Sequence, residues 1–159
     1  MPAEGGGAAR SFWVAALCLP LFLFVRLLLE PVAAATPRAA TAELLGYAAS
    51  WSGYALAALA LCRTMNREAL WPRFIATWNW MNLIQYLIMV GITVISLPLL
   101  PGWLREIASV GAIGYAMWLQ WFAARTALEL PALPAASFVF LDLMISIMLS
   151  GVVTDLSRT

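Results

Sequence analysis

Polar side chains inside hydrophobic segments are the residues of this chain that could do chemistry. The segment TWNWMNLIQY, residues 77–86, carries Asn79, Asn82 and Gln85 at the start of an apolar run, and Asp142 stands within another run. A carboxylate among amides can hold a proton, a cation or a polar solute. The same groups can also serve only to hydrogen-bond helices to one another, at about 0.6–2 kcal/mol per bond. The residue types leave both interpretations open.

The spacing of these residues predicts that they form one cluster. Asn79 and Asn82 share a helix face, as do Asn82 and Gln85, because residues three apart are neighbours on a helix. A charged carboxylate at the centre of a membrane helix costs about 2.5–3.5 kcal/mol on insertion scales, so Asp142 is expected to face other helices. The candidate intramembrane polar cluster comprises Asn79, Asn82, Gln85, Gln120, Asp142 and Ser146.

The composition argues against catalysis. The chain has no histidine, which removes the commonest zinc ligand, the commonest general base and the usual haem ligand. Asp142 stands among amides without a second acid, and the sequence has neither a nucleophile elbow nor a Gly-rich phosphate loop. Cys18 and Cys62 lie in or at the end of apolar runs, where cysteine acts as a small hydrophobic residue. We therefore expect no enzyme activity, no metal and no cofactor.

Hydrophobic segments of membrane-spanning length define the elements that must position the cluster. The 159 residues are 64% hydrophobic and 11% charged, against about 45–50% and about 25% in a typical soluble domain. The expected surroundings are therefore a lipid bilayer, in which a span needs roughly 20 apolar residues. These features predict an all-α polytopic membrane helix bundle, a single domain over residues 1–159, with five transmembrane helices at about 12–29, 44–62, 76–97, 105–124 and 136–153.

Prolines mark the four predicted connections between these helices. They are Pro31 with Pro37, Pro72 after Trp71, Pro98 with Pro101, and Pro131 with Pro134. All four connections are short, so neighbouring spans are expected to run antiparallel. An alternative for the first segment is a cleaved signal peptide, because the small residues at 33–35 could form a cleavage site; the length of its apolar run favours a span.

The arginines predict an orientation and a location. Positive residues gather on the cytoplasmic side of membrane proteins, and an inside N-terminus places on that side Arg10, Arg63, Arg67, Arg73 and Arg125. The composition, rich in Ala, Leu and Arg without Lys, is typical of a GC-rich bacterial genome, so we expect the bacterial inner membrane. Arg26 and Glu30 are one helical turn apart and are predicted to form an anchor pair near the outer end of the first span. The net charge of +1 predicts no nucleic-acid partner.

Small residues on the second span predict a packing surface. Ala49, Gly53 and Ala57 follow one another at four-residue steps, with Gly46 and Ser50 on the adjacent row. Such rows allow the backbones of two helices to approach closely. The contact could be formed within the chain or with a second copy.

Two segments, RFIATWNWMNLIQ and GYAMWLQWFAARTAL, together with the five spans and the short loops, resemble the Yip family of five-span membrane proteins, including its bacterial members. The resemblance covers about residues 10–155 and implies a five-helix membrane architecture. Eukaryotic members are associated with small prenylated GTPases through a cytosolic N-terminal region. Only about ten residues precede the first span here, so that partner function does not carry over.

Two functions are compatible with these patterns. The first is a non-catalytic bacterial inner-membrane protein that acts through helix–helix association, as a membrane component or scaffold. The alternative is a small oligomeric transporter or channel with a polar site around Asp142, since five short spans rarely enclose a pathway alone. The expected partners are the lipid bilayer and either a second copy of the chain or other membrane proteins.

Overall fold

The fold is all-α. The computed structural model describes residues 4–29 and 37–158, which form five long helices and one short 3-10 turn: α1 (Glu4–Leu29), α2 (Pro37–Thr64), η2 (Glu68–Leu70), α3 (Trp71–Leu99), α4 (Gly102–Ala127) and α5 (Ala132–Arg158). Four segments are long and apolar enough to cross a bilayer: Ala40–Thr64, Glu68–Ile95, Gly102–Ala127 and Ala132–Asp155. The apolar part of α1, Trp13–Val25, is shorter. The chain is therefore a multi-pass membrane protein with four candidate spans.

Several prolines predicted to lie between helices instead belong to them. Pro37 is the first residue of α2, and Pro72 and Pro134 lie in the first turns of α3 and α5. Proline fits a first turn because its missing N–H would have no partner within the helix there. Pro101 does separate two helices, as the N-cap of α4. The helices consequently begin several residues earlier than the hydrophobic runs predict.

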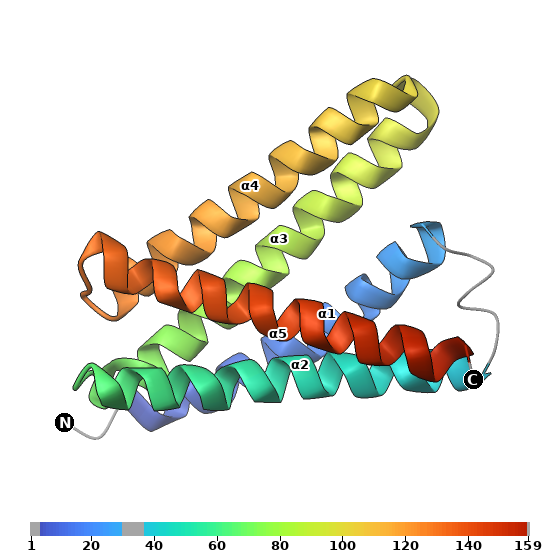
Figure 1. Cartoon of the computed structure of the whole chain (residues 1–159). Helices are drawn as coiled ribbons and strands as arrows, with labels where there is room; N and C mark the ends of the chain where they lie inside the picture. Colours follow the sequence, from blue (N-terminus) through green and yellow to red (C-terminus); the bar gives the residue numbers. More distant parts are fainter. Residues whose placement is uncertain (1–3, 30–36, 159) are drawn as a thin grey trace.

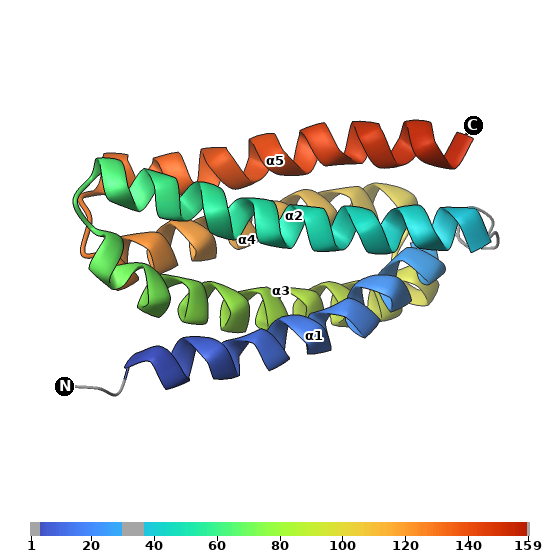
Figure 2. The same cartoon turned by 90° about the horizontal axis from the view of Figure 1, so that it is seen from below.

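The helices run up and down between two ends of a bundle (Figures 1 and 2). The start of α1 lies with the α2–α3 and α4–α5 connections at one end, and the end of α5 lies with the α3–α4 connection at the other. Helices distant in sequence pair most extensively: α1 packs along α3, and α2 packs along α5. The α3–α4 hairpin crosses this arrangement and diverges from α2 and α5 toward its tip (Figure 1).

The hydrophobic core lies where α2, α3, α4 and α5 come together. The rings of Phe74 and Phe138 meet edge to face with their centroids 5.2 Å apart, and both are fully buried. Tyr54 packs against Trp78 at a centroid distance of 4.6 Å. The same cluster is completed by several alanines and by Cys62, Ile75, Leu128 and Leu130. This core fixes the helices beside the polar residues of α3, α4 and α5.

The packing contact of α2 is made by Gly46 and not by the predicted row at Gly53. A Cβ atom at Gly53 would meet no atom within 4 Å, whereas one at Gly46 would collide with Cγ2 of Val153 on α5. The sequence pattern is compatible with either row, because both contain small residues. The way α2 is rotated against α5 places the close contact at Gly46 and leaves open space at Gly53.

Candidate functional site

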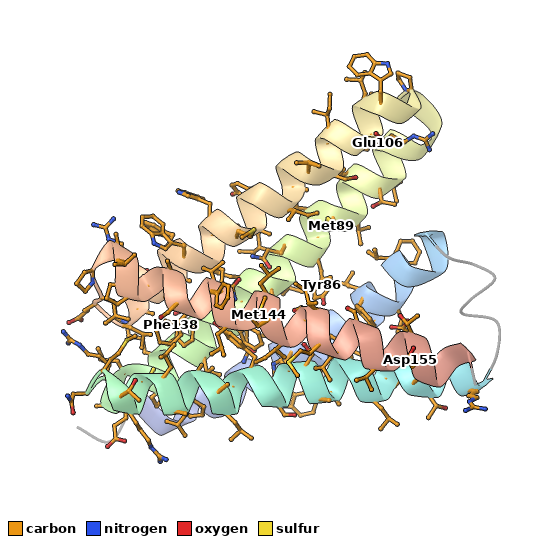
Figure 3. The ribbon with its side chains drawn as sticks, viewed as in Figure 1. Tyr86, Met89, Glu106, Phe138, Met144 and Asp155 are labelled. Carbon is orange, nitrogen blue, oxygen red and sulfur yellow. The ribbon has the colours of Figure 1, made fainter. Side chains whose placement is uncertain are left out.

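A small cavity lies between α1, α2, α3 and α5, next to the hydrophobic core. Its volume is about 120 Å³. Figure 3 shows Tyr86, one of its lining residues, on α3 near α1 and α5. The lining residues combine aromatic, amide, hydroxyl and carboxyl groups: Ala15, Cys18, Tyr47, Ser50, Trp51, Trp78, Asn79, Asn82, Tyr86, Asp142 and Ser146.

Four members of the predicted polar cluster line this cavity. They are Asn79 and Asn82 from α3 and Asp142 and Ser146 from α5. Gln85 does not join them, because its Nε2 donates a hydrogen bond to the carbonyl of Ala116 on α4 at 3.0 Å. Asn82 and Gln85 are three residues apart on α3, but Gln85 points toward α4, which packs alongside α3 (Figure 1), and not into the cavity.

Asn79 holds one wall of the cavity in place. Its side chain is fully buried, and its Oδ1 accepts a hydrogen bond from Nε1 of Trp51 at 3.0 Å. An unsatisfied amide at this depth would cost about 1–3 kcal/mol, so the bond fixes both side chains. Asn82 is half-buried on the same helix, and the described residues supply no hydrogen bond to its amide.

Asp142 meets an amide from α4. The Gln120 side chain lies beside the Asp142 carboxyl, and its Nε2 donates to the hydroxyl of Tyr54 at 3.4 Å. That hydroxyl in turn donates to the carbonyl of Phe138 at 3.4 Å. The chain of polar contacts therefore joins α2, α4 and α5 behind the cavity. Gln120 is a member of the predicted polar cluster, but it does not line the cavity itself.

Within residues 4–29 and 37–158, the ion pairs between described side chains lie away from Asp142. Arg63 contacts Glu68 at 3.2 Å, and Arg73 contacts Glu129 at 3.3 Å, both in exposed positions at one end of the bundle. The predicted anchor pair cannot be located, because the side chain of Arg26 and all of Glu30 lie outside the described part of the structure.

Aromatic side chains form most of the remaining cavity wall, and the sequence analysis did not include them in the site. Tyr47 and Trp51 come from α2, and Trp78 and Tyr86 come from α3. The Tyr47 hydroxyl donates to the carbonyl of Ala15 at 3.0 Å, which ties α1 to α2. Their spacing could have indicated a shared wall, because Tyr47 and Trp51 are four residues apart and therefore lie on the same face of α2.

Trp78 also differs from the expectation for a membrane-interface residue. Its side chain is 6% exposed, whereas Trp80, two positions later on α3, is 54% exposed. Tryptophans near the ends of membrane helices usually lie at the lipid–water interface. The rotation of α3 turns Trp78 toward the core and leaves Trp80 on the outside.

The chemistry available in the cavity is binding by one carboxyl group, amides, hydroxyls and aromatic faces. Cys18 contributes a buried thiol to the wall, and Cys62 is buried in the core. Among the described residues, no group of three or more His, Cys, Asp or Glu side chains is arranged to hold a metal ion.

In comparisons with known proteins, no family model, curated protein or solved structure matches this chain. The resemblance to the Yip family stays a prediction about architecture. The class of the protein follows from its helices: it is a multi-pass membrane protein in contact with the lipid bilayer.

Proposed function

We propose that this chain binds a small polar solute in the Asp142 cavity and acts as a small membrane transporter. The observation that carries the proposal is the cavity itself, which has a volume of about 120 Å³ and is lined by a carboxyl group and amides from the membrane helices. Polar residues that serve only to join helices are expected to contact one another directly. The space left between them is the reason to infer a ligand.

The proposal includes five membrane crossings in a bacterial inner membrane. In it α1 is the fifth span, which is supported by its packing along α3 and by the placement of Ala15 and Cys18 in the cavity wall. In the proposal the N-terminus is cytoplasmic. This is supported by the arginine-rich connection between α2 and α3, which lies at the same end of the bundle as the start of α1 (Figure 2).

The proposed activity is transport without catalysis. One carboxyl group among amides supplies no acid–base pair for a reaction. A cavity of about 120 Å³ does not by itself connect the two sides of a membrane. Transport therefore requires either a rearrangement of the helices around the site or a symmetric oligomer.

Scaffolding through helix–helix association is the second candidate function. It is favoured by the open space at Gly53, because the row of Ala49, Gly53 and Ala57 packs against nothing at that point within one chain. A second copy of the chain or another membrane protein could use this row. Both functions are compatible in one protein, since a transporter of this size would benefit from association.

The orientation can be measured by cysteine labelling. We expect Gly102→Cys, in a background with Cys18→Ala and Cys62→Ala, to react with a membrane-impermeant maleimide added from the periplasm. Gly102 suits the substitution because the nearest atom to a new Cβ is 4.0 Å away. Arg67→Cys is expected to react only after the membrane is opened. Labelling at position 67 from the periplasm would reverse the assigned orientation.

A second pair of cysteine variants, Ser146→Cys and Ile147→Cys, measures whether water and charged reagents enter the cavity. Both positions are exposed in the single chain, but Ser146 lines the cavity and its neighbour Ile147 does not. A thiol in lipid does not ionise and reacts poorly with charged methanethiosulfonates. In the same cysteine-free background, we expect position 146 to react at least tenfold faster than position 147. Equal rates would remove the support for a solute site.

A further inference from the structure

The cavity combines a carboxyl group with aromatic walls, which together favour one class of ligand. We propose that the Asp142 cavity binds a small organic cation of the alkylammonium type. The inference rests on the proposed function, because it names the chemical class of the solute.

The walls offer the surfaces that attract an organic cation. Tyr47, Trp51, Trp78 and Tyr86 line the space, and Asp142 is the acidic group among the lining residues. A cation over the face of Trp or Tyr is attracted by the negative face of the ring, and aromatic cages are a common solution for binding ammonium groups. In its ionised form the Asp142 carboxyl group supplies the opposite charge, and a bound cation favours that form.

The aromatic walls are held in position before a ligand enters. Nε1 of Trp51 is bonded to Asn79 at 3.0 Å, and the Tyr47 hydroxyl is bonded to the carbonyl of Ala15 at 3.0 Å. Phe22 packs against Tyr47 with the ring centroids 5.2 Å apart and against Tyr86 at 6.3 Å. Walls that are already ordered lower the entropy lost on binding.

The size of the space selects a small ligand. A volume of about 120 Å³ is several times the share of one water in the liquid, roughly 30 Å³, and is close to the cavity of about 150 Å³ that accepts benzene. It is well below the range of about 300–1,000 Å³ that is typical of sites for drug-sized molecules. Tetramethylammonium and other small ammonium ions are of a size that such a volume can hold.

Other ligand classes fit this cavity less well. None of the described lining residues is an arginine, so an anion would have no partner beside the Asp142 carboxyl. Hard metal cations prefer about six or more oxygen ligands, and the aromatic rings occupy much of the wall where such oxygens would have to be. A neutral solute brings no charge to offset an ionised carboxyl group, so it would pair only with the protonated form of Asp142.

The ligand class can be tested by thermal unfolding of the full-length protein in detergent. Tetramethylammonium chloride is expected to raise Tm saturably, because a ligand that binds only the folded state stabilises it. Sodium chloride at equal ionic strength and tert-butanol, a neutral molecule of similar shape, are the controls. We expect the midpoint concentration for tert-butanol to be at least tenfold higher. Equal midpoints for the cation and the alcohol would overturn the proposal.

Variants of the wall separate binding from folding. Asp142→Asn is expected to weaken binding of tetramethylammonium at least tenfold, because the amide lacks the charge but keeps the shape. Tyr86→Leu should weaken it by about two- to thirtyfold, and Tyr86→Phe should retain it, since the phenyl face remains. Size-exclusion elution shows whether each variant is folded. Unchanged binding in folded Asp142→Asn would contradict the assignment.

The ammonium group could come from a free amine or from a lipid headgroup. Nanodiscs of phosphatidylethanolamine and phosphatidylglycerol can be compared with nanodiscs in which a neutral glycolipid replaces the phosphatidylethanolamine. Weaker apparent binding of tetramethylammonium in the first set identifies the headgroup as a competing occupant, and equal binding identifies a free amine. If position 146 is accessible to water and tetramethylammonium does not bind, the ligand class is wrong while the solute site stands.

Discussion

Phe138→Ala is expected to lower the free energy of unfolding by about 3 kcal/mol. Phe138 is fully buried on α5 and packs edge to face against Phe74 on α3, so its removal leaves a cavity between two helices (Figure 3). Such substitutions cost about 3–5 kcal/mol in soluble cores. The lower end is expected here because lipid also solvates apolar groups, and the lost packing contacts carry most of the effect.

Phe140→Ala is the matched control for this prediction. Phe140 lies two positions later on the same helix and is 62% exposed. Its removal leaves no internal cavity, so the free energy of unfolding should change by less than about 1 kcal/mol. Unfolding in mild detergent with a graded denaturant measures both variants. A comparable loss for the two would show that position 138 is not part of a packed core.

Gly46→Leu is expected to destabilise the α2–α5 pair by about 1–3 kcal/mol, the usual range for overpacking. A Cβ at Gly46 already collides with Cγ2 of Val153, and valine has few rotamers into which it can move. The expected result is a lower Tm with an unchanged helix content. Reducing the neighbour with Val153→Ala should restore part of the stability to a Gly46→Ala variant.

Gly53→Leu is the control on the same helix. Among the described residues, no atom outside the local backbone of α2 lies within 4 Å of a Cβ built at this position, so a monomer should accept the larger side chain with little change in Tm. Should Gly53→Leu instead reduce the size of the particle in detergent, the row of Ala49, Gly53 and Ala57 would be a contact between copies. A loss of stability in Gly53→Leu that equals that of Gly46→Leu would contradict the assigned rotation of α2.

The polar residues of α3 have other hydrogen-bonding partners in the structure than the sequence predicts. The sequence predicts that Asn79, Asn82 and Gln85 are the partners of Asp142. In the structure Asn79 bonds to Trp51 and Gln85 bonds to Ala116, so each is satisfied by another helix. Gln120 is the amide beside the carboxyl group. Of the polar residues of α3, Asn79 and Asn82 thus line the cavity, whereas Gln85 joins α3 to α4.

The length and hydrophobicity of its segments are what the sequence alone determines about this protein. Each long apolar run must form a helix, because a bilayer leaves no other way to satisfy backbone hydrogen bonds within one segment. The chain therefore had to be an all-α membrane protein, and the positions of Asp142 and Gln120 along their helices followed from residue counting. These inferences are local and need no knowledge of which helices meet.

The tertiary structure alone decides which faces of those helices meet. The periodicity of a helix shows which residues share a face but not which neighbour that face contacts. Pairing between α1 and α3 and between α2 and α5 is set by the packing of all the helices together. That packing turns Trp51 and Trp78 into the cavity, turns Gln85 toward α4, and selects Gly46 over Gly53.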